Sequence, residues 1–308
     1  MNLDRVVLCR PQGGLNDVLC QIERVCRYAE RFNRTAIIDT NHHSTYSIKD
    51  QFSRYFVSRQ KSVILDSTEI ESRLRNVCVV PNFLAGDCHR YAAHFDHEVG
   101  YFVESTTRKP ITFDFAKDYA EPLLVHHASG RIDGDSVAAL SRLRLRNDLR
   151  DELIKRLKSI GQNYVSIHVR NTDYTTDYRS MLNQLKAHPA LLNCEKLFVA
   201  TDDIACLLFF RNMFPDIKIV SFSELPQESG LPIHRLSERD NVYERNRDAI
   251  LDLLMLACSS TFIFLQLNEN RWGTRYSGFS ILARDLRNSK KVLAGLISRH
   301  EIHIDPII

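Results

Sequence analysis

The sequence has no long hydrophobic run. No stretch of its 308 residues approaches the ~20 consecutive apolar residues that a membrane-spanning helix needs. The N-terminus, from Met1 to Arg5, leads straight into a predicted strand and lacks the basic segment and apolar core of a secretion signal. We therefore expect no integral membrane segment.

The sequence also has little excess charge of either sign. Its 41 Lys and Arg residues against 38 Asp and Glu residues give a formal net charge of +3. So small an excess indicates neither a nucleic-acid partner nor an anionic membrane surface. The hydrophobic fraction of 44% and the charged fraction of 26% are typical of a globular protein, and the length allows two ordinary domains.

Cysteines spaced for metal or redox chemistry are absent. None of the eight cysteines forms a Cys-x-x-Cys pair, which argues against a zinc ribbon or a thioredoxin-type site. We interpret the cysteines as reduced core residues. Adjacent histidines occur at His42-His43 and His126-His127, but neighbours in a strand point to opposite faces, so one pair cannot form a site alone. We expect no metal and no cofactor.

What the sequence does contain is a short apolar strand that delivers polar residues to its end. Residues 164–169 are β-branched and apolar, as is typical of a central strand of a parallel sheet. Ligands bind just beyond the carboxyl ends of such strands. Arg170 follows this strand, and its guanidinium suits a phosphate. The alternative is that Arg170 only pairs with a neighbouring carboxylate.

The second half of the chain alternates regularly between two kinds of element. Strands are expected at residues 164–169, 196–201, 217–222 and 261–265, and helices at 180–186, 204–214, 247–258 and 277–287. This alternation predicts a parallel, doubly wound sheet in an α/β protein.

The first half begins with a predicted βαβ unit. Apolar spacing indicates a helix over residues 15–32, between strands at 5–10 and 35–40. This order points the Gly13-Gly14 loop at the ligand edge of the sheet, where free N–H groups suit an anion or a sugar hydroxyl. The alternative is that these glycines serve only a tight turn. Further strands are expected at 77–84 and 122–127.

A long helix is expected over residues 136–160, close to a domain junction. It is preceded by Asp133-Gly-Asp135, which matches the Asp-x-Asp metal motif of one class of glycosyltransferase. That motif should follow a buried strand, whereas this one stands where a helix begins. Helix capping is therefore the better interpretation.

Five segments together resemble one enzyme family. His168-Val-Arg-Asn-Thr-Asp173 resembles the His-x-Arg-Arg-x-Asp signature of the GDP-fucose-dependent fucosyltransferases, especially the α1,6 and nodulation type and the protein O-fucosyltransferases. Segments 12–17, 197–203, 248–256 and 276–283 resemble, in order, other parts of these enzymes. The chain departs from the signature at Asn171, where the family has a second arginine, and its glycine loop is shorter than usual.

The resemblance implies a GT-B fold with two Rossmann-type, doubly wound domains facing a cleft. It implies an acceptor-side domain at residues 1–150 and a nucleotide-sugar domain at 151–308. The implied activity is inverting, metal-independent transfer of a sugar, fucose from GDP-fucose, to a glycan acceptor in polysaccharide biosynthesis. Animal enzymes of this family in the secretory pathway carry a membrane anchor that is not found here. We therefore expect a cytoplasmic enzyme, free or peripheral at the inner face of the membrane.

The resemblance and the strand ends together give a set of candidate donor-binding residues. They are Gly13, Gly14, Asn16, His168, Asp202, Asp203, Ser277, Gly278, Phe279 and Ser280. Asp202 or Asp203 would accept hydrogen bonds from guanine; the alternative is that Asp203 caps the next helix and Asp202 is solvated. Ser277 begins a helix whose N–H groups suit a diphosphate. His168 would touch base or ribose, or else be a core histidine.

Sugar transfer needs charge stabilisation on the departing diphosphate and a base for the acceptor hydroxyl. Arg170 and a helix N-terminus are predicted to supply the first. The base is expected to be Asp17, in the glycine loop, or Asp173. Two alternatives remain open: a transferase that uses another GDP- or UDP-linked sugar, and a non-catalytic nucleotide-sugar-binding protein, since one signature arginine is missing.

Overall fold

The computed structural model of the protein describes residues 4–45, 48–66, 68, 77–130, 135–171, 174–225, 242–268 and 273–298. These residues form two compact units. Unit 1 lies within Met1–Arg146 and Ala294–Ile308, and unit 2 lies within Asn147–Leu293. The domain boundary predicted from the sequence falls between residues 150 and 151.

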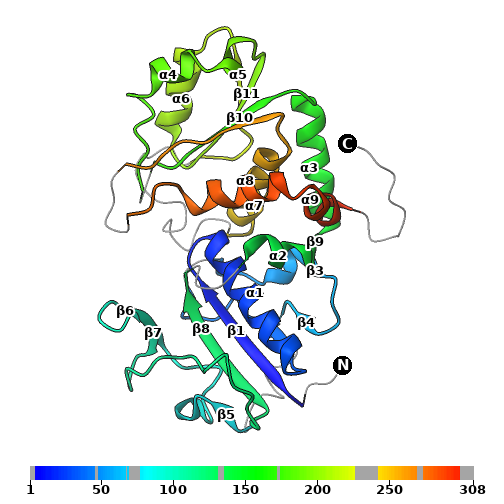
Figure 1. The fold of residues 1–308 in the computed structure, drawn as a ribbon, viewed down its shortest axis with the longest axis vertical. Coiled ribbons are helices and arrows are strands. Elements are labelled where there is room, and N and C mark those ends of the chain that lie inside the picture. Colours follow the sequence, from blue (N-terminus) through cyan, green and yellow to red (C-terminus); the bar gives the residue numbers. More distant parts are fainter. Residues whose placement is uncertain are drawn as a thin grey trace. The chain divides into compact units, whose positions relative to one another are not determined.

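Unit 1 is built on a five-stranded sheet (Figure 1). Its strands lie in the order β4 (Val63–Ile64), β2 (Thr35–Ile38), β1 (Val6–Gln12), β8 (Leu123–Ser129) and β5 (Val79–Val80). All four pairings are parallel. Every residue of β1 is buried, which fits its place in the middle of the sheet.

Both faces of this sheet are covered. Helix α1 (Leu15–Arg31) follows β1 and packs along one face, and its predicted apolar side chains, among them Val18 and Ile22, are buried except for Leu15, which is half-buried. The opposite face packs against the chain between β5 and β8, where Tyr91 and Ile111 share a core with β1 and β8. This chain includes the short helix η2 (Asn82–Leu84) and a hairpin. The hairpin consists of β6 (Ala93–Asp96) and β7 (Tyr101–Glu104).

Two elements predicted within residues 77–160 are wrong. The expected helix at 136–160 is instead α2 (Ser136–Ser141), β9 (Leu143–Leu145) and α3 (Asn147–Ile160). The interruption arises because β9 pairs antiparallel with β3 (Phe56–Ser58), which follows the short helix η1 (Phe52–Arg54), and this pairing buries Leu143 and Leu145. The expected strand at 77–84 is paired only at β5, and η2 begins right after Pro81.

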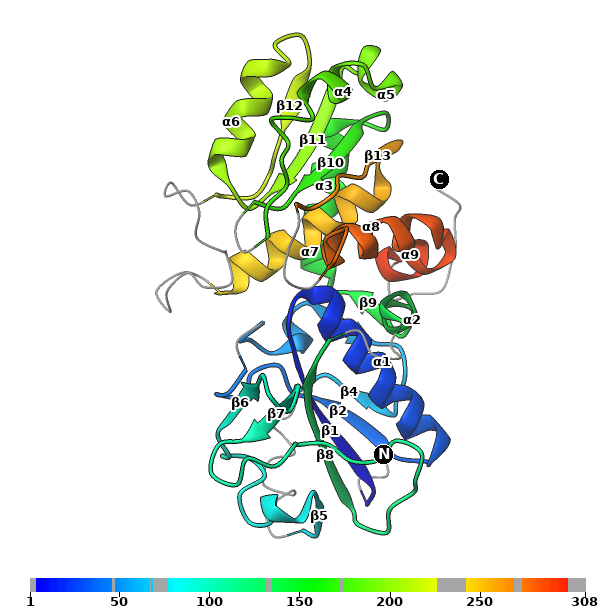
Figure 2. The ribbon, with the colours of Figure 1, turned by 60° about the vertical axis from the view of Figure 1, so that its left-hand side comes forward.

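Unit 2 is built on a four-stranded parallel sheet, as predicted (Figure 2). Its order is β12 (Lys218–Val220), β11 (Lys196–Thr201), β10 (Val165–Val169) and β13 (Thr261–Ile263). Its described helices are α3, α4 (Leu182–Lys186), α5 (Pro189–Leu192), α6 (Ile204–Met213), α7 (Val242–Cys258) and α8 (Gly278–Asn288). Helix α9 (Lys290–Ile297) begins in unit 2, and its residues from Ala294 on belong to unit 1.

Alternate residues of β10 face different helices, so the sheet is doubly wound. Ile167 shares a core with Leu185, Leu191 and Phe210, on the side of α4, α5 and α6. His168 points the other way, where α7 and α8 pack against each other and α7 also contacts β10 and α3. One face of β10 therefore packs in an apolar core, and the other face carries the polar pair of His168 and Ser280 near the end of the strand.

Two sequence-based expectations concern the whole chain. All eight cysteines are free, but they are not all core residues, because Cys78 is exposed and Cys194 and Cys258 are half-buried. Of the helices in the described ranges, none has the length and apolar character needed to cross a membrane.

Candidate functional site

The carboxyl ends of β10 and β11 bring the predicted donor-binding residues of unit 2 together. The two strands run parallel with Val169 opposite Thr201, so the residues that follow each strand leave the sheet side by side. Arg170 Nη1 lies 2.9 Å from Asp202 Oδ2, and the backbone N–H of Asn171 donates to Asp202 Oδ1 at 2.9 Å. The alternative in which Arg170 pairs with a carboxylate is therefore present in the structure.

The two acids after β11 have different roles. Asp203 caps α6, accepting a hydrogen bond from the N–H of Ala205 at 2.9 Å, as one of the sequence-based alternatives predicted. Its other oxygen accepts from Asn171 Nδ2. Asp202 is only 6% exposed, so the expectation that it is solvated is wrong. Its burial follows from the ion pair with Arg170, because a carboxylate leaves water only when it is paired.

His168 lies beneath this edge and contacts the start of α8. Its Nδ1 is 2.7 Å from Ser280 Oγ, and its ring centroid is 4.9 Å from that of Phe279. Burial, aided by the charge of Arg170, lowers the pKa of His168 to about 3, so the imidazole is neutral at pH 7. Ser277 caps α8 through a 3.2 Å hydrogen bond from the N–H of Phe279. The structure thus unites residues that lie more than a hundred positions apart.

The glycine loop of unit 1 is a tight turn between β1 and α1. Gly13 has φ +100°, a conformation that favours glycine, and a Cβ there would lie 2.9 Å from Asp17 Cβ and Oδ2. Gly14 occupies the N-cap position of α1, so neither Asn16 nor Asp17 caps this helix. Asn16 is 5% exposed, and its Oδ1 finds no hydrogen-bond partner within the described ranges. Asp173, the other candidate base, lies outside those ranges.

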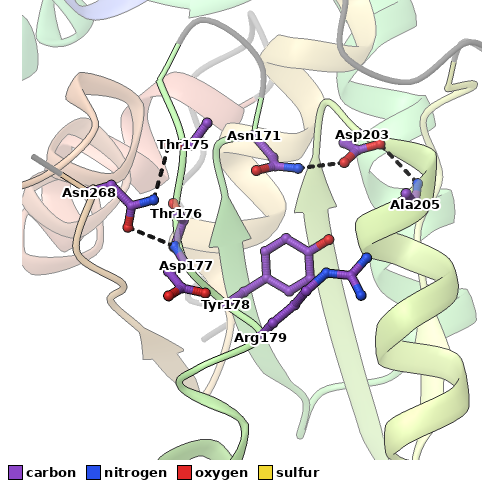
Figure 3. A pocket seen from close by; sticks show the side chains of 9 residues that line it. All are labelled: Asn171, Thr175, Thr176, Asp177, Tyr178, Arg179, Asp203, Ala205 and Asn268. Atoms are coloured by element: carbon purple, nitrogen blue, oxygen red, sulfur yellow. Dashed lines mark hydrogen bonds between the residues drawn. The ribbon is translucent and has the colours of Figure 1, made fainter. Parts of the chain in front are cut away.

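A cavity of about 460 Å³ opens at the same edge of unit 2 (Figure 3). It is lined by Asn171, Thr175, Thr176, Asp177, Tyr178, Arg179, Asp203, Ala205 and Asn268. Of these residues, only Asp203 was a predicted site residue. Asn171 stands within the signature at residues 168–173 but was not proposed as a site residue. The others lie on a loop beyond β10, on α6 and after β13, where no motif marks them. A polar loop soon after a central strand was the only available signal.

Unit 2 also contains a buried charged cluster that the sequence did not reveal. Arg156 on α3 pairs with Asp248 at 2.6 Å and lies 3.5 Å from Asp252, both on α7. Burial raises the pKa of Asp252 to about 7, even though Ser223 donates a 2.6 Å hydrogen bond to its Oδ2. In the described part of the chain, no group of three or more His, Cys, Asp or Glu side chains is placed to hold a metal ion.

No protein-family model matches this sequence, and no curated protein matches it. Solved structures do. The crystal structure of fucosyltransferase NodZ from Bradyrhizobium matches with a TM-score of 0.60 at 20% identity, over 92% of this chain and 93% of that chain. NodZ α1,6-fucosyltransferase co-crystallized with GDP matches with a TM-score of 0.59, at 20% identity and over 92% of each chain. The chain has the fold of a GT-B fucosyltransferase.

This GT-B-like fold extends to a second group of enzymes. POFUT1 in complex with GDP-fucose matches with a TM-score of 0.53 at 11% identity, over 94% of this chain and 95% of that chain. The resemblance seen in five short segments of the sequence is therefore confirmed as a likeness of fold over nearly the whole chain. Identities of 20% and below concern the fold, and the roles of Arg170, His168 and the acids stay predictions.

Proposed function

We propose that the protein transfers fucose from GDP-fucose to a hydroxyl of a glycan acceptor, with inversion at the anomeric carbon and without a metal. The observation that carries the proposal is the meeting of Arg170, His168 and the first turn of α8 at one sheet edge. It is supported by the fold, which is shared with enzymes crystallised with GDP or GDP-fucose. A cytoplasmic place, free or peripheral at the membrane, in polysaccharide synthesis belongs to the same proposal.

Arg170 and α8 are suited to hold the diphosphate. The guanidinium has five N–H donors in a planar fork, and the ion pair with Asp202 orients this fork at the sheet edge. The first N–H groups of α8, around Gly278 and Phe279, carry the partial positive charge of a helix N-terminus. Together these groups would stabilise the charge that develops on the leaving GDP.

The transfer itself is a single displacement. The acceptor oxygen forms a bond to the anomeric carbon, the bond from that carbon to the diphosphate breaks, and GDP leaves with the electron pair. A carboxylate takes the proton of the acceptor hydroxyl. Asp17 and Asp173 are the proposed candidates for this base. The neutral imidazole of His168 would contribute a hydrogen bond to the donor, not a charge.

The nucleotide base is where the second candidate function enters. Asp202 and Asp203 were predicted to accept from guanine, and their oxygens already accept from Arg170, Asn171 and Ala205. Because these oxygens already have partners, they are less suited to select guanine. A transferase that uses another GDP- or UDP-linked sugar is therefore the second candidate. A binding protein without catalytic activity is the remaining alternative.

Calorimetric titration with GDP and with UDP, followed by assays of donor hydrolysis and transfer, tests these candidates. We expect GDP to bind more tightly than UDP, GDP-fucose to be consumed, and turnover to persist in excess EDTA. Equal binding of GDP and UDP would remove guanine selectivity. GDP binding without turnover of any donor would support the binding protein, and activity lost on chelation and restored by manganese would refute the metal-free mechanism.

A further inference from the structure

The cavity at the end of β10 has the size and position of a ligand subsite. Its volume of about 460 Å³ falls in the range of roughly 300–1,000 Å³ that is common for small-molecule sites. It lies at the carboxyl ends of β10 and β11, because Asn171 and Asp203, which follow these strands, both line it. The donor is proposed to bind at this same sheet edge, around Arg170 and α8, while the cavity opens there on the side of α6.

The loop that forms one wall is held in place by Asn268. The Asn268 backbone N–H donates to Thr175 O at 2.8 Å, and its Nδ2 donates to Thr175 Oγ1 at 3.1 Å. Its Oδ1 accepts from the N–H of Asp177 at 3.1 Å (Figure 3). Three hydrogen bonds from one residue therefore fix the wall before any ligand arrives, which lowers the entropy cost of binding.

The charges of the lining disfavour a phosphate. Asp177 and Asp203 contribute two carboxylates, and Arg179 contributes one guanidinium. That guanidinium stacks near the rings of Phe209 and Tyr178, at 5.3 and 5.6 Å from their centroids. Hydrogen bonds from Ser180 lower the pKa of Asp177, so its carboxylate is ionised and acts only as an acceptor. An anionic ligand would meet a net negative lining.

The polar groups instead match hydroxyls. Thr175 and Thr176 carry hydroxyls, Asn171 and Asn268 carry amides, and Asp177 accepts, so the lining has both donors and acceptors. Figure 3 shows the Asn171 amide with its nitrogen toward Asp203 and its oxygen toward the other side. An arginine at this position, as in the His-x-Arg-Arg-x-Asp signature, would add bulk and a second cation to the lining. Asparagine adds no charge to the lining at this position.

We propose that this cavity is a subsite for a neutral, hydroxylated sugar residue. The inference rests on the proposed function, because it names the class of substrate group that binds at the same sheet edge of unit 2 as the diphosphate. The sugar is either the one carried by the donor or a residue of the acceptor glycan. Both have the same chemistry, and binding experiments separate them.

The decisive variant is Ala205→Phe, which fills the cavity without removing any lining polar group. Leu208→Phe is the matched control, because Leu208 is 49% exposed on the same helix α6 and does not line the cavity. A second variant, Asp177→Asn, keeps the volume and removes the anionic acceptor. Saturation-transfer NMR with glucose, galactose, N-acetylglucosamine and their β-linked dimers measures sugar binding directly, and calorimetry measures GDP and GDP-fucose.

If the donor sugar occupies the cavity, Ala205→Phe should weaken GDP-fucose about tenfold or more, the scale of one misfitting group, and leave GDP unchanged. If the acceptor occupies it, both nucleotides should bind normally while the saturation-transfer signals disappear. Leu208→Phe should change neither, and Asp177→Asn should act in the same direction as Ala205→Phe, more weakly. Sugar and GDP-fucose binding that is unaffected by both cavity variants overturns the proposal, as does equal loss of GDP and GDP-fucose. Failure of the wild type to bind GDP while sugars still bind would refute the proposed function alone.

Discussion

In both units an arginine and an aspartate stand one position beyond the last paired residues of two neighbouring parallel strands. In unit 1 the register of β1 and β2 sets Arg10 beside Asp39, and the two form an ion pair at 2.8 Å. In unit 2 the register of β10 and β11 sets Arg170 beside Asp202, paired at 2.9 Å. The Arg10 side chain is only 2% exposed, whereas that of Arg170 is 24% exposed.

Their surroundings explain this difference in exposure. Arg10 also donates to Cys88 O at 2.7 Å and lies over the ring of Tyr91, whose hydroxyl is 3.0 Å from His127. At the edge of unit 2 the packing is more open, and Asn171, the residue after Arg170, lines a cavity. The side chain of Arg10 is closed inside a packed polar network, whereas that of Arg170 is partly exposed at the sheet edge. We therefore expect changes in unit 1 to reduce stability and changes in unit 2 to reduce activity.

The largest expected difference between the two units is in their stability at low pH. Burial lowers the pKa of His42 to about 2, of His126 to about 3 and of His127 well below its usual value, all in unit 1. Below pH 6.5 the unfolded chain binds protons at these side chains and the folded unit does not, so stability falls as pH falls. Lowering the pH from 7 to 5 should reduce the free energy of unfolding by up to about 2 kcal/mol for each of these histidines.

Unit 2 should respond less, because two opposite effects meet there. The lowered pKa of His168 acts in the same direction as in unit 1. The pKa of Asp252, raised to about 7, acts in reverse, since between about pH 7 and pH 4 the folded state binds the proton and the unfolded state does not. Hydrogen exchange by mass spectrometry, corrected for intrinsic rates, should show protection lost first in β1, β2 and β8. Equal loss in β10 and β11 would contradict the contrast.

Arg10→Ala should cost about 3–5 kcal/mol of unfolding free energy, because it leaves Asp39 buried without its partner. Urea unfolding measures this loss. Lys117→Ala is the control, since Lys117 and Asp114 form a 3.5 Å pair with side chains 71% and 46% exposed, and such exposed pairs contribute little to stability. A loss below that of the control would mean that the network in unit 1 does not depend on Arg10.

Arg170→Ala should lower turnover by about 10²–10³, the usual effect of removing one preorganised donor to developing charge. Its unfolding free energy should change less than that of Arg10→Ala, because Asp202 keeps the N–H of Asn171 as a donor. Arg170→Lys should recover little turnover, since a point charge does not replace the planar fork. Near wild-type turnover in Arg170→Ala would disprove the role of this residue as phosphate anchor.

The comparison also shows which parts of the molecule were predictable. Strands β10 and β11 and the cap at Asp203 follow from local patterns, namely a short apolar run and an acid before a helix. The break at β9 was hidden because it depends on Phe56, far away in the sequence. Apolar spacing near a helix period is then outweighed by a tertiary pairing.

The site was predictable only where it stays close to a strand end. Arg170 and His168 were found in this way, but Arg10 was not, although it occupies the equivalent place in unit 1. Burial separates the two arginines, and burial depends on distant residues such as Tyr91. Asp177 and Asn268 were missed for the same reason, since they meet only through folding.

The smallest expected effect distinguishes two residues that cap helices, one in each unit. Ser277 caps α8 in unit 2 and Asp135 caps α2 in unit 1, where its side chain accepts from the N–H groups of Val137 and Ala138. Replacing either by Ala should cost about 1 kcal/mol of unfolding free energy. Only Ser277→Ala should also weaken GDP, by about three- to tenfold if its hydroxyl helps to hold the diphosphate.

Ser277→Asp distinguishes capping from ligand binding at the same position. Aspartate caps a helix as well as serine does, so unfolding by urea should show little change. Its negative charge would, however, stand at the helix end proposed for the diphosphate, and like charges repel at that distance. Calorimetry should therefore show weaker GDP binding in Ser277→Asp than in Ser277→Ala. Wild-type affinity for GDP in Ser277→Asp would move the diphosphate away from α8 and leave Arg170 as its only proposed anchor among the described residues.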